Sequence, residues 1–86
     1  MKKAQVYKVK CDEGYMLFKL ELLLEKHNLS VYRFVKDLDI ANNTATRYIK
    51  GTIVRLDIDV LSKMCNYFNC SINDIVEYVK EVTVKN

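Results

Sequence analysis

The segment from Asn42 to Lys50 carries the side chains that are best suited to recognition chemistry in this sequence. Ala45, Tyr48 and Ile49 are spaced as on one face of a helix, so we expect them to point inward. The opposite face then presents five polar side chains, none of them acidic: Asn42, Asn43, Thr46, Arg47 and Lys50. Asparagine pairs bidentately with adenine, arginine with guanine, and threonine offers a hydroxyl or a methyl group. This face is therefore suited to contacting base edges in the major groove of duplex DNA.

The charge distribution around this helix favours a polyanionic partner. The chain has 86 residues and a net charge of only +3, but all eleven acidic residues lie outside the stretch from Ile40 to Leu56. Arg47, Lys50 and Arg55 lie inside it. The local field is therefore more positive than the net charge indicates. The alternative, a helix face that is merely solvated, would usually mix both signs of charge.

A second short helix and a tight turn must hold this segment in place. Ser30 supplies an N-cap oxygen to a predicted helix over Val31–Leu38. Asp39 ends that helix, Ile40 anchors the turn, and Gly51 offers the left-handed conformation that ends the following helix. Two short helices joined in this way let one helix enter the major groove while the other braces it.

Three more helices are predicted outside this pair. Apolar residues at three- and four-residue steps predict a helix over residues 15–28. Asp57 is expected to cap a fourth helix with an apolar stripe. Ser71 followed by Asp74 resembles a capping box, and it predicts a fifth helix whose inner face extends to Val79.

Alternation of apolar and polar residues predicts two strands, at about residues 5–10 and 81–85. An isolated strand leaves backbone groups unpaired, so we expect the two to pair as a two-stranded ribbon, within the chain or across a dimer. The predicted fold class is all-α, a compact five-helix bundle with these strands added. We expect a single domain over residues 1–86 with its core at 15–79, because the chain is too short for two.

Several landmarks agree in register with a known pattern. They are Leu29-Ser30 before the second helix, Ile40 in the turn, Thr44 early in the third helix, Gly51 after it, and Cys70-Ser71 before the fifth. With them the sequence resembles the Cro/C1-type (XRE-like) helix-turn-helix domains of the lambda-repressor-like fold. The resemblance implies base-contacting positions at Asn42, Asn43, Thr46 and Arg47, and phosphate-contacting positions near Ser30, Val31, Thr44, Lys50 and Arg55.

The sequence departs from the family pattern at a few of these positions. Val31 stands where many relatives place a polar, phosphate-binding side chain. Beside it, the hydroxyl of Tyr32 is expected to reach a phosphate near the start of the second helix. Leu24 and Ile49 occupy the two places where many relatives join an arginine to a glutamate, so we expect a hydrophobic contact instead.

The sequence therefore predicts specific binding to double-stranded DNA by a small transcriptional regulator, with the helix Asn42–Lys50 in the major groove. One such helix contacts few base pairs, so we expect a homodimer, joined through the fifth helix or the terminal strands. A different hypothesis is a protein-interaction module on the same fold, similar to an antirepressor, that does not bind DNA. Val31, Ile53 and Val54 favour that hypothesis, since exposed aliphatic side chains beside the groove would suit a protein partner.

Other classes of function find no support in the residues. The chain has one histidine and no Gly-rich phosphate loop, GxSxG or HExxH motif, so we expect neither an enzyme nor a cofactor or small-molecule ligand. His27, Cys65 and Cys70 have poor spacing for shared ligation, so reduced thiols and no metal site are expected. No apolar run is long enough for a bilayer and no secretory signal follows Met1, which predicts a cytoplasmic location without a membrane partner.

Overall fold

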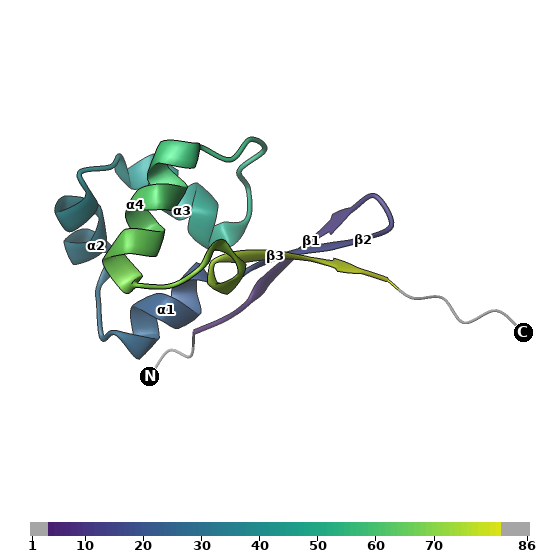
Figure 1. The fold of residues 1–86 in the computed structure, drawn as a ribbon, viewed down its shortest axis with the longest axis horizontal. Helices are drawn as coiled ribbons and strands as arrows, with labels where there is room; N and C mark the ends of the chain where they lie inside the picture. The colour runs from purple at the N-terminus through teal and green to yellow at the C-terminus, as the bar shows by residue number, and fades with distance from the viewer. Residues whose placement is uncertain (1–3, 82–86) are drawn as a thin grey trace, which may run out of the picture.

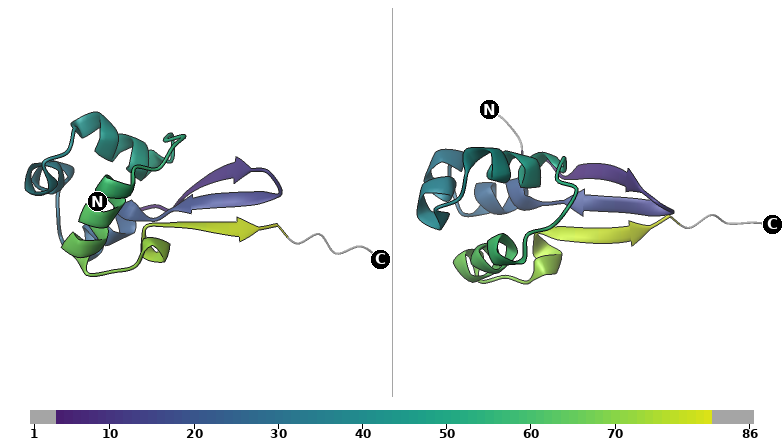
Figure 2. Two further views of the ribbon diagram at one scale, coloured as in Figure 1. Left: turned by 45° about the horizontal axis from the view of Figure 1, so that its top comes forward. Right: turned by 90° about the horizontal axis from the view of Figure 1, so that it is seen from above.

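The computed structural model describes residues 4–81, which form four α-helices and one three-stranded antiparallel sheet. In chain order the elements are β1 (Tyr7–Cys11), β2 (Gly14–Phe18), α1 (Leu20–Lys26), α2 (Val31–Leu38), α3 (Asn42–Lys50), α4 (Ile58–Phe68), the 3-10 helix η1 (Ile72–Asp74) and β3 (Val76–Lys80). The helices gather at one end and the sheet extends away from them (Figure 1). The two further views in Figure 2 show the same arrangement. No helix in this part of the chain has the length and apolar character needed to cross a membrane.

The core lies among the four helices and the near end of the sheet. The largest side chains without exposed surface are Leu20, Phe34, Tyr48, Met64 and Ile75. The first four come from four different helices and Ile75 precedes β3, so one shared apolar cluster joins all these segments. Phe18 on β2 and Val76 on β3 are paired residues on neighbouring strands, and both are also buried.

β2 is the central strand of the sheet. It pairs antiparallel with β1 through Val9 and Met16, and with β3 through Met16 and Tyr78. Where β2 leads into α1, the Lys19 N–H donates to the carbonyl oxygen of Ile75 at 2.8 Å. This bond ties the start of α1 to the segment that leads into β3, so the sheet is fixed to the helices where the chain enters and leaves them.

The all-α, five-helix fold class predicted from the sequence is wrong, because the described residues form an α+β arrangement. The predicted helix over residues 15–28 begins only at Leu20, and Gly14–Phe18 forms β2 instead. Tyr15, Met16 and Leu17 are all half-buried. A strand that is partly covered on both faces shows no clear alternation, so its apolar residues also fit a helical spacing.

The predicted fifth helix is wrong as well. Ser71 and Asp74 do interact, since the Ser71 N–H donates to the Asp74 carboxylate at 3.1 Å, but the helix ends after one 3-10 turn. Val76–Lys80 then forms β3 along the free edge of β2. Pairing there satisfies backbone groups on both strands, and the β-branched and aromatic residues of this segment suit a strand.

The predicted ribbon between the two terminal strands is not formed by the described residues. β1 coincides with much of the strand predicted at residues 5–10, but its partner is β2. Of the strand predicted at residues 81–85, Glu81 lies outside any strand, and residues 82–85 lie outside the described part of the chain.

The helix pair at the centre of the sequence is confirmed. α2 and α3 have the predicted bounds. Ser30 caps α2, its Oγ accepting the Arg33 N–H at 3.1 Å. Asp57 caps α4, because its Oδ1 accepts the backbone N–H groups of Asp59 at 2.9 Å and Val60 at 3.3 Å.

Replacing Gly14 by alanine tests the pairing of β2 with β3. A Cβ at Gly14 would meet the Val79 carbonyl oxygen and lie 2.8 Å from the Lys80 Cα, so the strands would have to separate. We expect Gly14→Ala to lower the free energy of unfolding by about 1–3 kcal/mol in urea denaturation. Glu13→Ala, in the exposed turn, is the control and should change little. If residues 14–18 were helical, Gly14→Ala would instead stabilise the protein.

Candidate nucleic-acid interface

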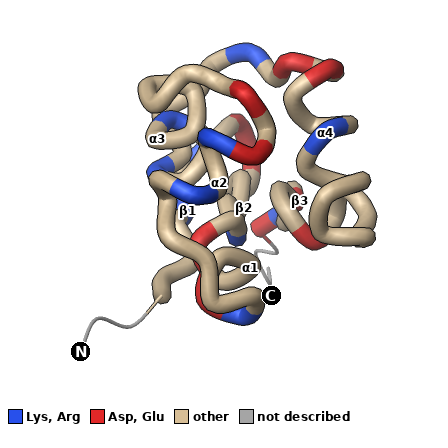
Figure 3. Tube along the Cα trace, turned by 90° about the vertical axis from the view of Figure 1, so that its left-hand side faces the viewer, with Lys and Arg blue, Asp and Glu red and all other residues tan. Residues whose placement is uncertain are grey.

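α3 presents two faces of opposite character, as the sequence predicts. Ala45, Tyr48 and Ile49 are buried in the core. The polar side chains lie on the other side: Asn42, Asn43, Arg47 and Lys50 are exposed, and Thr44 and Thr46 are half-buried. The charged segments of α3 are all basic (Figure 3). The helix therefore holds a polar, positively charged surface away from the core.

The C-terminal end of α3 is fixed against the sheet. Gly51 adopts the left-handed conformation with φ 74°, and its N–H donates to the Arg47 carbonyl oxygen at 2.9 Å. A Cβ on Gly51 would lie 2.8 Å from side-chain atoms of both Phe18 and Val9. Only glycine fits this close approach, so the end of α3 rests directly on β1 and β2.

Tyr48 fixes the other side of α3. Its ring is fully buried, and its hydroxyl accepts a hydrogen bond from the Asp57 backbone N–H at 2.8 Å. Burial raises the pKa of the Tyr48 hydroxyl above its ordinary value, so the group stays neutral at physiological pH. Because Asp57 also caps α4, this bond fixes the start of α4 and the end of the loop over residues 52–56 relative to α3.

The N-terminal end of α3 is open. Asp39 ends α2 in the left-handed conformation with φ 57°, and the chain turns into α3 two residues later. Ala41 occupies the N-cap and offers no side-chain acceptor, and the first turn contains no acidic residue. The first N–H groups of a helix have no partner within it and carry its partial positive charge, so this end of α3 is suited to an anion.

The side-chain hydroxyl of Thr46 already donates a hydrogen bond within α3. Its hydroxyl donates to the Asn42 carbonyl oxygen one turn earlier, at 3.0 Å. The hydroxyl hydrogen is therefore used within the helix, and the side chain presents an oxygen lone pair and a methyl group. Thr46 can accept a hydrogen bond from a base or contact a thymine methyl group.

A hollow of about 670 Å³ lies between α3 and the loop that follows it. Its lining consists of Thr44, Arg47, Thr52, Ile53, Val54, Arg55 and Asp57. Three predicted DNA-contacting residues, Thr44, Arg47 and Arg55, thus meet at one site. Sequence reasoning missed Thr52 and Asp57 here. The Asp57 carboxylate accepts two N–H groups at the start of α4, whose partial positive charge offsets its own.

The other predicted phosphate-binding residues are distributed differently. Ser30 lines a separate hollow of about 290 Å³, together with Glu21 and Glu25. Two carboxylates beside Ser30 oppose the approach of a phosphate, which the sequence did not indicate. Tyr32 is 72% exposed, and Lys50 is exposed at the end of α3.

Arg33 is a basic residue near these groups, but it is paired within its own helix. Its Nε lies 3.1 Å from the Asp37 carboxylate, and the Tyr67 hydroxyl donates to the same carboxylate at 2.6 Å. The Tyr67 hydrogen bond, with a further contribution from Arg33, lowers the pKa of the Asp37 carboxyl. The carboxylate therefore stays charged at physiological pH and offsets the charge of Arg33, whereas α3 and its loop have no acidic residue among their basic ones.

Comparison with known proteins identifies the fold of this helix pair. The family model of the Cro/C1-type helix-turn-helix DNA-binding domain matches residues 19–81, which is most of the chain. The chain belongs to this family. In the Cro/C1-type domain described here, Leu24 and Ile49 lie in one buried cluster, consistent with the expected hydrophobic contact in place of an ion pair.

One solved structure is similar over most of its length. The crystal structure of the transcriptional regulator VanUg aligns with a TM-score of 0.64 and 22% sequence identity, covering 85% of this chain and 96% of that one. At this identity the likeness concerns the fold. No curated protein matches the chain in sequence.

Removing the Tyr48 hydroxyl tests how the loop and α4 are fixed to α3. Tyr48→Phe leaves the Asp57 N–H without its partner at 2.8 Å in a partly buried place. We expect the free energy of unfolding to fall by about 1–3 kcal/mol, measured by thermal or urea denaturation. Tyr32→Phe removes the same atom from an exposed ring and should have no measurable effect. Equal effects of the two substitutions would contradict this role of Tyr48.

Proposed function

We propose that this protein binds duplex DNA in a sequence-specific manner, with α3 in the major groove, and that it acts as a transcriptional regulator. The observation that carries the proposal is the outer face of α3, where Asn42, Asn43, Arg47 and Lys50 are exposed while the opposite face is buried. Membership in a DNA-binding family supports it. The similar fold of VanUg, a transcriptional regulator, is consistent with the regulatory role.

The side chains divide into two roles under this proposal. Asn42, Asn43, Thr46 and Arg47 contact base edges, since amide, hydroxyl and guanidinium groups match the donors and acceptors of the major groove. The phosphate contacts come from Ser30, Tyr32, Thr44, Lys50 and Arg55. Among these, Thr44 and Arg55 are the best supported, because they share the hollow with Arg47. Ser30 is the least supported, because carboxylates border it.

The open end of α3 adds an anion contact to these side chains. Without an acidic residue or a capping side chain in the first turn, its N–H groups are available to a DNA phosphate. Backbone contacts of this kind set the position of a helix on the duplex but do not distinguish sequences. Specificity therefore depends on the base-contacting side chains.

A homodimer on a two-fold operator fits this small contact surface. A single helix of nine residues reaches few base pairs, and each bidentate contact contributes about 1–3 kcal/mol of discrimination. Two copies would double the contacted sequence. Selection of bound duplexes from a random library should then return paired half-sites about 10 base pairs apart, whereas a monomer would select one short site.

The protein-interaction hypothesis keeps one specific observation in its favour. Val54 lies at the rim of the hollow beside α3 and is 92% exposed. Val31 is only moderately exposed, and Ile53 is half-buried. Binding to a random duplex at increasing salt separates the two hypotheses, because affinity falls steeply when Lys and Arg neutralise phosphates. No binding at low salt would favour the protein partner.

Two substitutions on α3 separate base contacts from phosphate contacts. Arg47→Ala should relax the preference at one base pair of the selected site, at a cost of about 1–3 kcal/mol on that site. Lys50→Ala should weaken binding to all duplexes alike and reduce the salt slope by about 1. Both effects are measured by fluorescence anisotropy with the selected site and a scrambled duplex over a range of salt.

Lys26→Ala is the matched control for Lys50→Ala. Both lysines are exposed in the last turn of a helix, but Lys26 lies on α1. We expect Lys26→Ala to change affinity far less than Lys50→Ala. If Arg47→Ala and Lys50→Ala both left affinity and sequence preference unchanged, α3 would not be the DNA-contacting element.

A further inference from the structure

Two cysteines meet at the C-terminal end of α4. After Phe68, Asn69 adopts the left-handed conformation with φ 54°, and its N–H donates to the Asn66 carbonyl oxygen at 3.4 Å. The Cys70 N–H donates to the Cys65 carbonyl oxygen at 3.0 Å. This pair of bonds defines a Schellman motif, which frequently brings the side chains of its first and last residues together. Here the two residues are Cys65 and Cys70.

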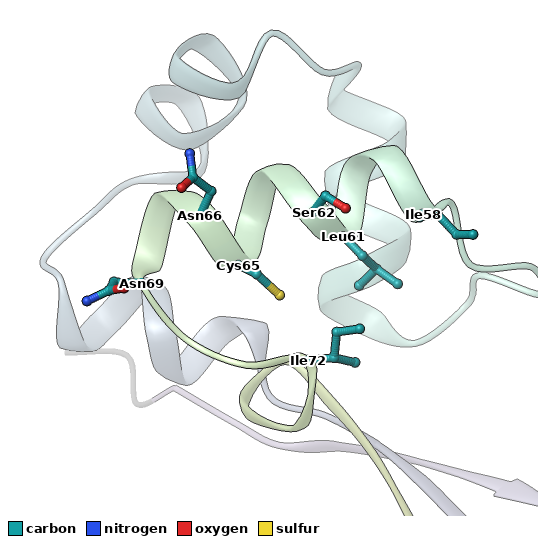
Figure 4. Close-up of a pocket in the computed structure, with 7 residues that line it drawn as sticks. All are labelled: Ile58, Leu61, Ser62, Cys65, Asn66, Asn69 and Ile72. Atoms are coloured by element: carbon teal, nitrogen blue, oxygen red, sulfur yellow. The ribbon is translucent and has the colours of Figure 1, made fainter.

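Cys65 is accessible from one side. It lines a hollow of about 450 Å³ between α4 and η1, together with Ile58, Leu61, Ser62, Asn66, Asn69 and Ile72. In Figure 4 the sulfur of Cys65 points from α4 toward Ile72, into the space between the two elements. The lining contains no charged side chain, and its amide and hydroxyl groups offer hydrogen bonds to a small, polar reagent. A small molecule that enters this hollow therefore meets the Cys65 thiol.

The Cys70 thiol is held in its neutral form. Burial raises the pKa of Cys70, and interaction with the neighbouring Cys65 raises it further, while Lys26 opposes the change. Because the thiolate is the reactive form, this raised pKa lowers the reactivity of Cys70 toward a reagent from solvent. Across residues 4–81, no group of three or more His, Cys, Asp or Glu side chains is placed to hold a metal ion.

We propose that Cys65 and Cys70 form a dithiol site that a low-molecular-weight disulfide, such as oxidised glutathione, converts to an intramolecular disulfide. In the first step the Cys65 thiolate attacks one sulfur of the reagent, forming a mixed disulfide and releasing one small thiol. In the second step Cys70 loses its proton and attacks the Cys65 sulfur, releasing the second small thiol. Two electrons pass from the protein thiols to the reagent, which takes up two protons.

The backbone holds the two cysteines at opposite ends of one closed turn. A disulfide requires Cα atoms about 4.4–6.8 Å apart, with Cβ atoms directed toward each other. The hydrogen bond from the Cys70 N–H to the Cys65 carbonyl oxygen closes the turn between the two residues and keeps their backbones close together. Cys11, the third cysteine, lies on β1 and lines a different hollow with Val9, Met16 and Phe18. It has no cysteine beside it there, so a variant that keeps Cys11 alone provides the reference thiol.

The test measures the redox equilibrium of the pair in the folded protein. Cys11→Ser protein is equilibrated with reduced and oxidised glutathione, quenched with acid, and analysed by mass spectrometry. We expect a species that has lost two hydrogens, with the bond located between Cys65 and Cys70 by digestion. The effective concentration of the two thiols should be at least about tenfold higher in the folded protein than in the same protein in urea. An effective concentration no higher than in urea would overturn the proposal.

Single substitutions separate the two steps. In the Cys11→Ser background, Cys70→Ser should accumulate a glutathione adduct on Cys65, and Cys65→Ser should form an adduct on Cys70 more slowly. The Cys65→Ser/Cys70→Ser double variant is made without the Cys11→Ser substitution, so Cys11 is its only cysteine. It reports the reaction of an unrelated half-buried thiol. Faster modification of Cys70 than of Cys65 would contradict the assigned order. Circular dichroism checks that each variant folds, and the equilibrium measured on Cys11→Ser protein does not depend on these variants.

Discussion

The hydrogen bond between the Tyr48 hydroxyl and the Asp57 backbone N–H links the interior of this protein to the surface proposed to contact DNA. A fully buried tyrosine requires a partner for its hydroxyl, and Tyr48 finds it in the residue that caps the next helix. The loop over residues 52–56 is therefore held between Gly51, which rests on the sheet, and Asp57, which is bound to α3. This loop and α3 together line the hollow that contains Thr44, Arg47 and Arg55.

The helices were predictable because their signals are local. Ser30 and Asp57 accept hydrogen bonds from residues two or three positions away, and Gly51 ends α3 through its own backbone conformation. β2 and β3 depend instead on a partner far away in the chain. Tyr15–Leu17 shows no alternation because both faces are partly covered, and β3 forms where β2 leaves an edge free. The capping box at Ser71 therefore predicted a longer helix than the one that forms. Pairing of β3 with the distant strand β2 limits this helix to one 3-10 turn.

The candidate site shows the same division between local and long-range information. The inward and outward faces of α3 follow from helical periodicity, and the structure confirms them. The carboxylates of Glu21 and Glu25 beside Ser30 come from another element and depend on tertiary packing. The Asp57 carboxylate follows Arg55 by two residues in the chain, just outside the stretch that lacks acidic residues. The lack of acidic residues between Ile40 and Leu56 is a property of one stretch of sequence. A ligand contacts the folded surface, which several segments of the chain form together.

The central position of β2 has a consequence for how the protein forms during synthesis. β1 and β2 leave the ribosome before the helices and can pair as a hairpin, but such a hairpin alone is marginally stable in water. All four helices are made before β3, which must then return to the edge of a strand made long before it. Because contacts between distant segments form slowly, we expect the helices to assemble early. Pairing of β3 with β2 should then be the last step of folding.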